Sequence, residues 1–87
     1  MSILKVSIRQ VKAARALLGW SQDDLAANAG VSVPTVKRLE AGDGFLGGRP
    51  QTAQKLRSAV ESAGIEFTNG DQPGVRLRRG RRRAGKF

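Results

Sequence analysis

The sequence contains no cysteine, no histidine and no tyrosine. Without Cys and His, the chain has no disulfide and none of the thiolate or imidazole ligands with which proteins bind zinc or haem. The same absence excludes Cys/His and Ser–His–Asp catalysis. We therefore expect no metal site, no cofactor and no catalytic residues, and we predict that the protein is not an enzyme.

The sequence also lacks long apolar runs. No run approaches the roughly 20 residues that a membrane-spanning helix needs. The first residues do not have the basic-then-apolar pattern of a secretory signal sequence. We therefore expect a soluble intracellular protein that does not contact a membrane.

Acidic residues are scarce: seven stand against 16 Lys and Arg residues, which gives a net charge of +9. A strongly basic domain is typical of nucleic-acid binders, although an acidic membrane surface attracts the same charge. The end of the chain is the most basic part, since residues 78–87 hold six basic residues and no acid. We interpret 79–87 as a disordered basic tail that contacts nucleic acid; a solvated terminus that only aids solubility is the alternative.

The 87 residues allow one small domain, and an apolar content of 39% allows a thin core. Four segments follow a Ser or Thr that can cap a helix start, and each precedes a Gly that can end a helix. These signals predict helices over Ile8–Leu18, Gln22–Ala29, Val33–Ala41 and Ala53–Ala63. From their spacing we predict a core of Ile8, Val11, Leu18, Leu25, Val31, Val36, Leu39, Leu56, Val60 and Phe67.

After Gly64 the period of apolar residues changes to two, which indicates strands. Ile65–Thr68 and Val75–Arg78 flank a segment rich in turn residues, so we predict a β-hairpin in which Glu66 faces Arg76 across the strands. A lone two-stranded hairpin is marginally stable in water. The hairpin must therefore pack on the helices, pair with a partner chain, or do both.

The second and third predicted helices are short, and Gly30 lies in the tight turn between them. This arrangement is typical of a DNA-binding helix-turn-helix. At about 100° per residue, Val36 falls on the buried side of the third helix. The opposite side, which would face a major groove, consists of Val33, Pro34, Lys37 and Arg38.

Three stretches resemble the lambda-repressor-like (Cro/XRE-type) helix-turn-helix family. They are Arg15–Ala26 with its SQxxLA pattern, Gly30-Val31-Ser32, and Thr35–Gly42 with its LExG pattern. The resemblance covers roughly residues 8–63. It implies that Gln22 contacts a phosphate, that Val33, Pro34 and Arg38 face base edges, and that Arg15 and Glu40 form a partly buried ion pair.

Within this resemblance Arg38 is the main residue that can form hydrogen bonds to base edges, because Val33 and Pro34 suit only apolar contact with a thymine methyl group. The candidate DNA contacts lie at the helix starts, on the third helix, in the following loop and in the tail. They are Ser21, Gln22, Ser32, Val33, Pro34, Thr35, Lys37, Arg38, Arg49, Arg79, Arg81, Arg82 and Arg83.

The expected fold is mainly α: a four-helix lambda-repressor-like domain over 1–64, a C-terminal β-hairpin over 65–78, and the disordered tail over 79–87. We predict a sequence-specific transcriptional regulator, a repressor or controller, of the bacterial or phage type in the cytoplasm. It would dock helix 33–41 in the major groove of double-stranded DNA as a homodimer. Two alternatives remain open: an antitoxin-like module that docks a protein partner at the hairpin, and a sequence-neutral nucleic-acid binder led by the Arg-rich tail.

Overall fold

The computed structural model describes residues 6–46, 50–68 and 73–78. Four helices precede one antiparallel hairpin, so the expected mainly α class with a C-terminal hairpin is confirmed. The elements are α1 (Ile8–Leu18), α2 (Gln22–Ala29), α3 (Val33–Glu40), α4 (Pro50–Ser62), β1 (Ile65–Thr68) and β2 (Gly74–Leu77).

Side-chain caps start the first three helices at the predicted residues. The hydroxyls of Ser7, Ser21 and Ser32 each accept a hydrogen bond from the backbone N–H three residues later. These bonds satisfy N–H groups that have no partner inside a helix. Gly19 and Gly30 end α1 and α2 in the left-handed region, with φ of 71° and 73°.

Three helix boundaries differ from the prediction: the end of α3 and both ends of α4, which ends at Ser62 rather than Ala63. α3 ends at Glu40, and its cap is Ala41 in a right-handed conformation rather than Gly42. A side chain at Gly42 would lie 3.3 Å from Cδ1 of Ile8, so Gly42 serves close packing instead. α4 begins at Pro50 and not after Thr52. Proline suits a first helical turn because its fixed φ matches the helix and its missing N–H is not needed there.

The core lies between the helices and the hairpin. Six of the ten predicted core residues are buried: Ile8, Val11, Leu25, Val36, Leu56 and Val60. The prediction was wrong for Leu18, Val31, Leu39 and Phe67, which are only half-buried against this cluster. Val6, Ala14 and Ala26 are buried in addition. Small side chains of this kind fill the space where helices approach closely.

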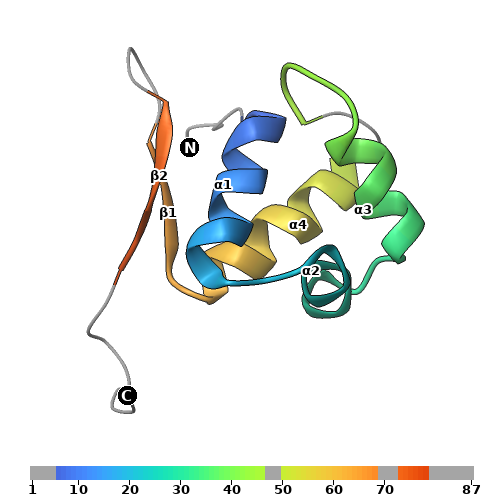
Figure 1. The fold of residues 1–87 in the computed structure, drawn as a ribbon, viewed down its shortest axis with the longest axis horizontal. Helices are drawn as coiled ribbons and strands as arrows, with labels where there is room; N and C mark the ends of the chain where they lie inside the picture. Colours follow the sequence, from blue (N-terminus) through green and yellow to red (C-terminus); the bar gives the residue numbers. More distant parts are fainter. Residues whose placement is uncertain (1–5, 47–49, 69–72, 79–87) are drawn as a thin grey trace.

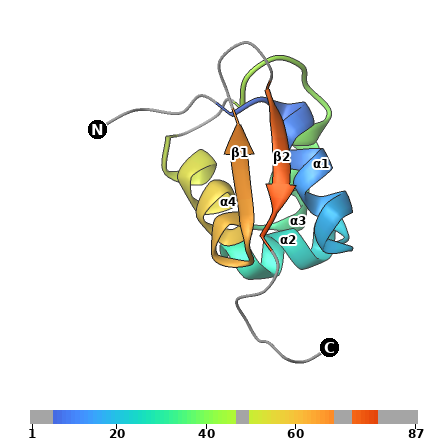
Figure 2. The same cartoon turned by 90° about the vertical axis from the view of Figure 1, so that its left-hand side faces the viewer.

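The hairpin forms a layer on one side of α1 and α4. Its register pairs Ile65 with Leu77, Glu66 with Arg76 and Phe67 with Val75. β2 packs against α1 and β1 packs against α4. Figures 1 and 2 show that α3 lies on the opposite side of the molecule, with α1 and α4 between it and the hairpin.

A buried amide attaches the hairpin to α1. Nε2 of Gln10 donates to the carbonyl oxygens of Thr68 and Gly74, at 2.9 Å each. Oε1 of the same side chain accepts the N–H of Ser7 at the cap of α1. Gln10 is 5% exposed. One side chain therefore completes the start of α1 and holds the far end of the hairpin against it.

The loop after α3 is attached to the start of α1. The N–H of Leu46 donates to the carbonyl of Val6 at 2.8 Å, and the N–H of Ile8 donates to the carbonyl of Gly44 at 2.9 Å. Ser7 and Phe45 form an isolated β-bridge. These contacts hold the end of α3 near the start of α1.

The core assignment predicts a large loss of stability for Leu25→Ala. Leu25 is 0% exposed, so its removal should lower the free energy of unfolding by about 2–5 kcal/mol. Urea unfolding of the full chain measures this. The control is Leu17→Ala, since Leu17 is 47% exposed and should change stability by only about 0.5 kcal/mol. Equal effects of the two substitutions would contradict the assignment.

Candidate nucleic-acid interface

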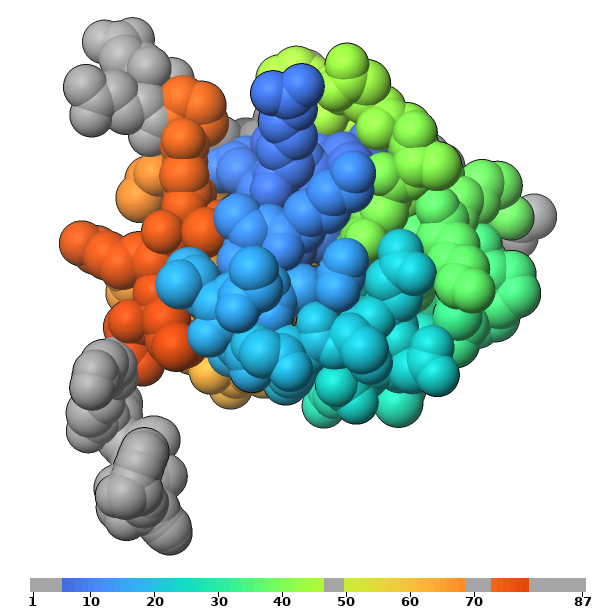
Figure 3. All heavy atoms as spheres, in the orientation of Figure 1, coloured from blue at the N-terminus to red at the C-terminus, as the bar shows by residue number. Residues whose placement is uncertain are grey.

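α3 presents an exposed, partly cationic side. Pro34, Lys37 and Arg38 are exposed, whereas Val36 on the other side of the helix is fully buried. Figure 3 shows that the atoms of α3 form one end of the molecular surface, opposite the hairpin. The exposed side of α3 therefore faces away from the rest of the fold and is open to a large ligand.

Two other candidate residues of α3, Val33 and Thr35, are less accessible to a DNA base. Val33 is half-buried and packs against the core, which reduces the surface it offers to a base. Thr35 is half-buried, and its hydroxyl lies 2.7 Å from the hydroxyl of the exposed Ser32. Ser32 also caps the helix by accepting the N–H of Thr35. The first turn of α3 is thus held by its own side chains.

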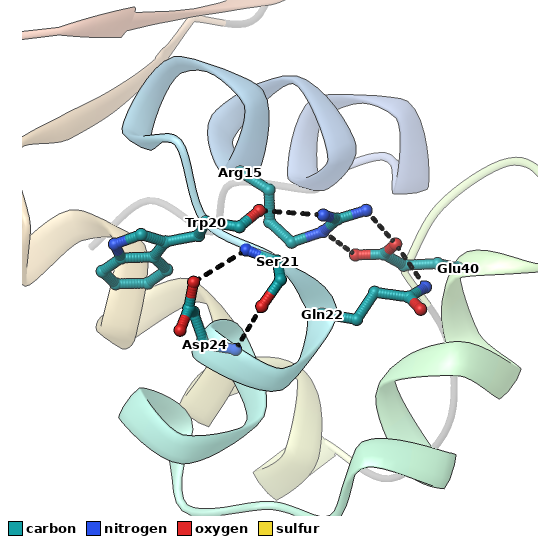
Figure 4. A network of polar contacts seen from close by, with 6 residues as sticks. All are labelled: Arg15, Trp20, Ser21, Gln22, Asp24 and Glu40. Carbon is teal, nitrogen blue, oxygen red and sulfur yellow. Dashed lines mark hydrogen bonds and ion pairs between the residues drawn. The ribbon is translucent and has the colours of Figure 1, made fainter.

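A buried ion pair joins α1 to α3 (Figure 4). Glu40 is 3% exposed. Nε of Arg15 donates to Oε2 of Glu40 and Nη2 donates to Oε1, both at 2.8 Å. Nη1 of Arg15 also donates to the carbonyl of Trp20 at 3.0 Å. This forked geometry fixes both the distance and the angle between the two helices.

The start of α2 joins the same network. Nε2 of Gln22 donates to Oε1 of Glu40 at 3.0 Å. The beginning of α2 therefore lies beside the end of α3. Ser21 is exposed at this point, and its hydroxyl and N–H are both paired with Asp24. The structure thus brings Ser21 and Gln22 to the end of α3.

Charged partners keep Glu40 ionised. Burial raises the pKa of Glu40, but hydrogen bonds from Arg15 and Gln22 and the nearby charge of Lys12 outweigh it, so the pKa is below its ordinary value. The hydrogen bond to Glu40 raises the pKa of Arg15. The pair is therefore fully charged at neutral pH.

Lys12 belongs to the surroundings of this network, although the sequence patterns did not point to it. It is exposed on α1 and close enough to Glu40 to lower the pKa of that carboxyl. Its position three residues before Arg15 places both on one side of α1, which could have indicated it. Five candidate contacts lie outside the described residues: Arg49, Arg79, Arg81, Arg82 and Arg83.

The described part of the chain offers no cluster of metal ligands. In the ranges 6–46, 50–68 and 73–78, no group of three or more His, Cys, Asp or Glu residues could hold a metal ion. The helices in these ranges are also too short or too polar to cross a membrane.

The Glu40 network predicts a pH-dependent effect of Glu40→Gln. Because the pKa of Glu40 is lowered in the folded state, its stabilisation is present above the unfolded value of about 4.3 and is lost as pH falls through the lower folded value. The substitution should lower the free energy of unfolding by about 1–3 kcal/mol at neutral pH. The difference should shrink in acid.

Denaturant unfolding at neutral and acidic pH measures both differences. Glu61→Gln is the control, because Glu61 forms an exposed pair with Arg57 on α4 and should show little effect at either pH. If Glu40→Gln destabilises equally at both pH values, the ion pair is not the source of the stability.

A family model described as helix-turn-helix matches residues 11–44 of the chain. The match covers most of α1, all of α2 and α3, and the turn between them. No curated protein matches the chain well enough to count as a relative. The match confirms the resemblance seen in the sequence: over residues 11–44 the chain is similar to the lambda-repressor-like (Cro/C1-type) helix-turn-helix family.

Proposed function

We propose that the protein is a sequence-specific transcriptional regulator that reads double-stranded DNA with α3. Helix-turn-helix domains of this family are DNA-binding regulatory domains, not enzymes. The observation that carries the proposal is the exposed side of α3 with Pro34, Lys37 and Arg38, held rigidly against α1 and α2 by the Glu40 network. A helix inserted in a major groove needs both that exposure and that rigidity.

The chemistry divides between two kinds of contact. Lys37 and the start of α2 suit phosphates, which give affinity without sequence information. Arg38 suits guanine, because its guanidinium can donate to O6 and N7 together. Pro34 offers an apolar surface to a thymine methyl group. Val33 can add to this apolar surface only the part of its side chain that is exposed.

We also propose that the regulator acts as a homodimer through an edge of the hairpin. The N–H of Arg78 donates to the carbonyl of Gly64 at 2.8 Å. Hydrogen-bonded and non-hydrogen-bonded residue pairs alternate along an antiparallel ladder, so residues 66 and 76 also form a hydrogen-bonded pair. The backbone N–H and C=O groups of the residues between them point outward at the two edges of the hairpin; these are residues 65, 67, 75 and 77. Among the described residues no third strand joins this sheet, and an edge left open in this way can pair with a second strand.

The geometry of the molecule suits such a dimer. The hairpin and α3 lie at opposite ends of the longest dimension of 36 Å, and the molecule measures 31 Å and 22 Å in the other two directions. Two copies joined side by side at a hairpin edge would present both α3 helices on one side. Two helices presented on one side is the arrangement that reads half-sites about one DNA turn apart.

The alternative of a protein-interaction module rests on the same hairpin edge, occupied by a different chain. The alternative of a sequence-neutral binder rests on the basic residues at 79–87, outside the described part. Neither alternative requires the exposed side of α3 to discriminate between DNA sequences. A measured preference for one DNA sequence over others therefore separates the proposal from both alternatives.

The groove-reading role predicts a selective defect for Arg38→Ala. The substitution should weaken binding to a duplex selected from random sequences by about 1–3 kcal/mol and relax the preference at one base position. Binding to random duplexes should change much less. Titrations on both duplexes measure this. An equal loss on both would show that Arg38 contacts the backbone and not a base.

Deletion of 79–87 is the matched comparison for this titration. It removes five basic residues and should flatten the slope of log affinity against log salt by about 0.9 for each phosphate that the tail no longer neutralises. The preference for the selected duplex should survive. If the preference disappears with the tail, the regulator proposal is wrong and the sequence-neutral binder is favoured.

The dimer proposal predicts two chains on each selected duplex. Sedimentation velocity of the full chain, free and with DNA, measures the mass of each complex. The free protein should show a concentration-dependent monomer–dimer equilibrium, or a dimer, and the complex should contain two chains. A monomer under both conditions would refute the homodimer.

A further inference from the structure

The outer face of the hairpin carries a second charged surface, formed by Glu66, Arg76 and Arg78. Nε and Nη2 of Arg76 donate to Oε1 of Glu66, at 3.1 and 2.6 Å. Nε of Arg78 donates to Oε2 at 2.8 Å. Arg76 and Arg78 lie two positions apart in the chain and therefore project from one face of the hairpin. A single carboxylate orients both guanidinium groups.

This surface keeps an excess of positive charge. The hydrogen bond from Arg76 lowers the pKa of Glu66, so its carboxyl is ionised and cancels one of the two cations. The side chains of Arg76 and Arg78 are 70% and 50% exposed. A guanidinium presents five N–H donors in a fork that matches phosphate oxygens. The pair is thus oriented by Glu66 and still accessible to an anion.

The surface cannot serve the DNA that α3 reads, because the hairpin and α3 lie on opposite sides of the fold (Figures 1 and 2). The chain continues from Arg78 into 79–87, which adds five basic residues and no acid. The hairpin itself therefore presents its positive charge on the side of the molecule away from α3.

The chemistry of the surface suits a phosphate backbone better than a protein. Protein interfaces are usually centred on buried aromatic or apolar anchors. In the described part of the chain the large exposed apolar residues are Leu17 on α1 and Phe45 in the loop after α3, and neither belongs to the hairpin. Exposed arginines without apolar anchors are what sequence-independent phosphate contacts need.

We propose that the outer hairpin face binds the backbone of a second DNA duplex while α3 is bound to its own site, so that the protein joins two DNA segments. The binding of the first duplex by α3 rests on the proposed function, whereas the binding of the second duplex by the hairpin does not. Binding at the hairpin is independent of sequence, and edge pairing of two hairpins would double the surface without covering it.

The test is a two-duplex capture assay with the full chain. An unlabelled selected duplex is immobilised and saturated with protein, and the retention of a fluorescent random-sequence duplex is then measured over a range of salt. The double variant Arg76→Gln/Arg78→Gln should abolish most of the retention. The slope of log affinity against log salt for the second duplex should fall by about 1.8, because two phosphates are no longer neutralised. Binding to the immobilised duplex should be unchanged.

Glu66→Gln should have the opposite effect on the retention of the second duplex. Removal of the carboxylate adds one net positive charge to the surface, so retention should rise and the salt slope should steepen by about 0.9. If the three side chains served only to stabilise the hairpin, Glu66→Gln would not improve retention. Lys55→Gln/Arg57→Gln on α4 removes the same charge as the hairpin double variant and should leave retention at the wild-type level.

Other variants separate this inference from the proposed function. Arg38→Ala should lose preference for the immobilised sequence but retain the second duplex when protein is loaded on a random one. Wild-type retention by the Arg76→Gln/Arg78→Gln variant would overturn the proposal. So would an equal loss in the α4 control, or retention of single-stranded RNA without retention of duplex DNA.

Discussion

The architecture depends on one buried carboxylate. Glu40, at the end of α3, receives two hydrogen bonds from Arg15 on α1 and one from Gln22 on α2. A buried charge without partners costs several kcal/mol, so the three helices must hold these positions together. The angle at which α3 projects from the domain follows from this requirement. The Glu40 network therefore fixes the orientation of the exposed residues of α3.

The hairpin completes the domain on the other side. Ile65 enters the core at 3% exposure, and the amide of Gln10 holds the carbonyls of Thr68 and Gly74. A two-stranded hairpin is stable here because it packs on α1 and α4. The result is a layered molecule with a helix surface at one end and a strand surface at the other (Figure 1). The two ends have different chemistry and are separated by the core.

Local signals predicted most of the fold, because capping is a short-range interaction. Ser21 and Gly30 mark the ends of α2 by chemistry that is complete within a few residues. The ion pair of Arg15 and Glu40 spans 25 positions and was expected only from the family resemblance. The contact of Gln10 with Thr68, 58 positions away, has no sequence signal, because a capping-box glutamine does not reveal what its second polar atom binds.

The central claim is that α3 reads a DNA sequence. Its most direct test is selection of bound duplexes from a random pool by the full chain, followed by sequencing. We predict enrichment of a pseudo-palindrome whose half-sites are about one helical turn apart, with a guanine at one position of each half-site for Arg38. A pool that stays random after repeated selection, while binding persists, would contradict the claim.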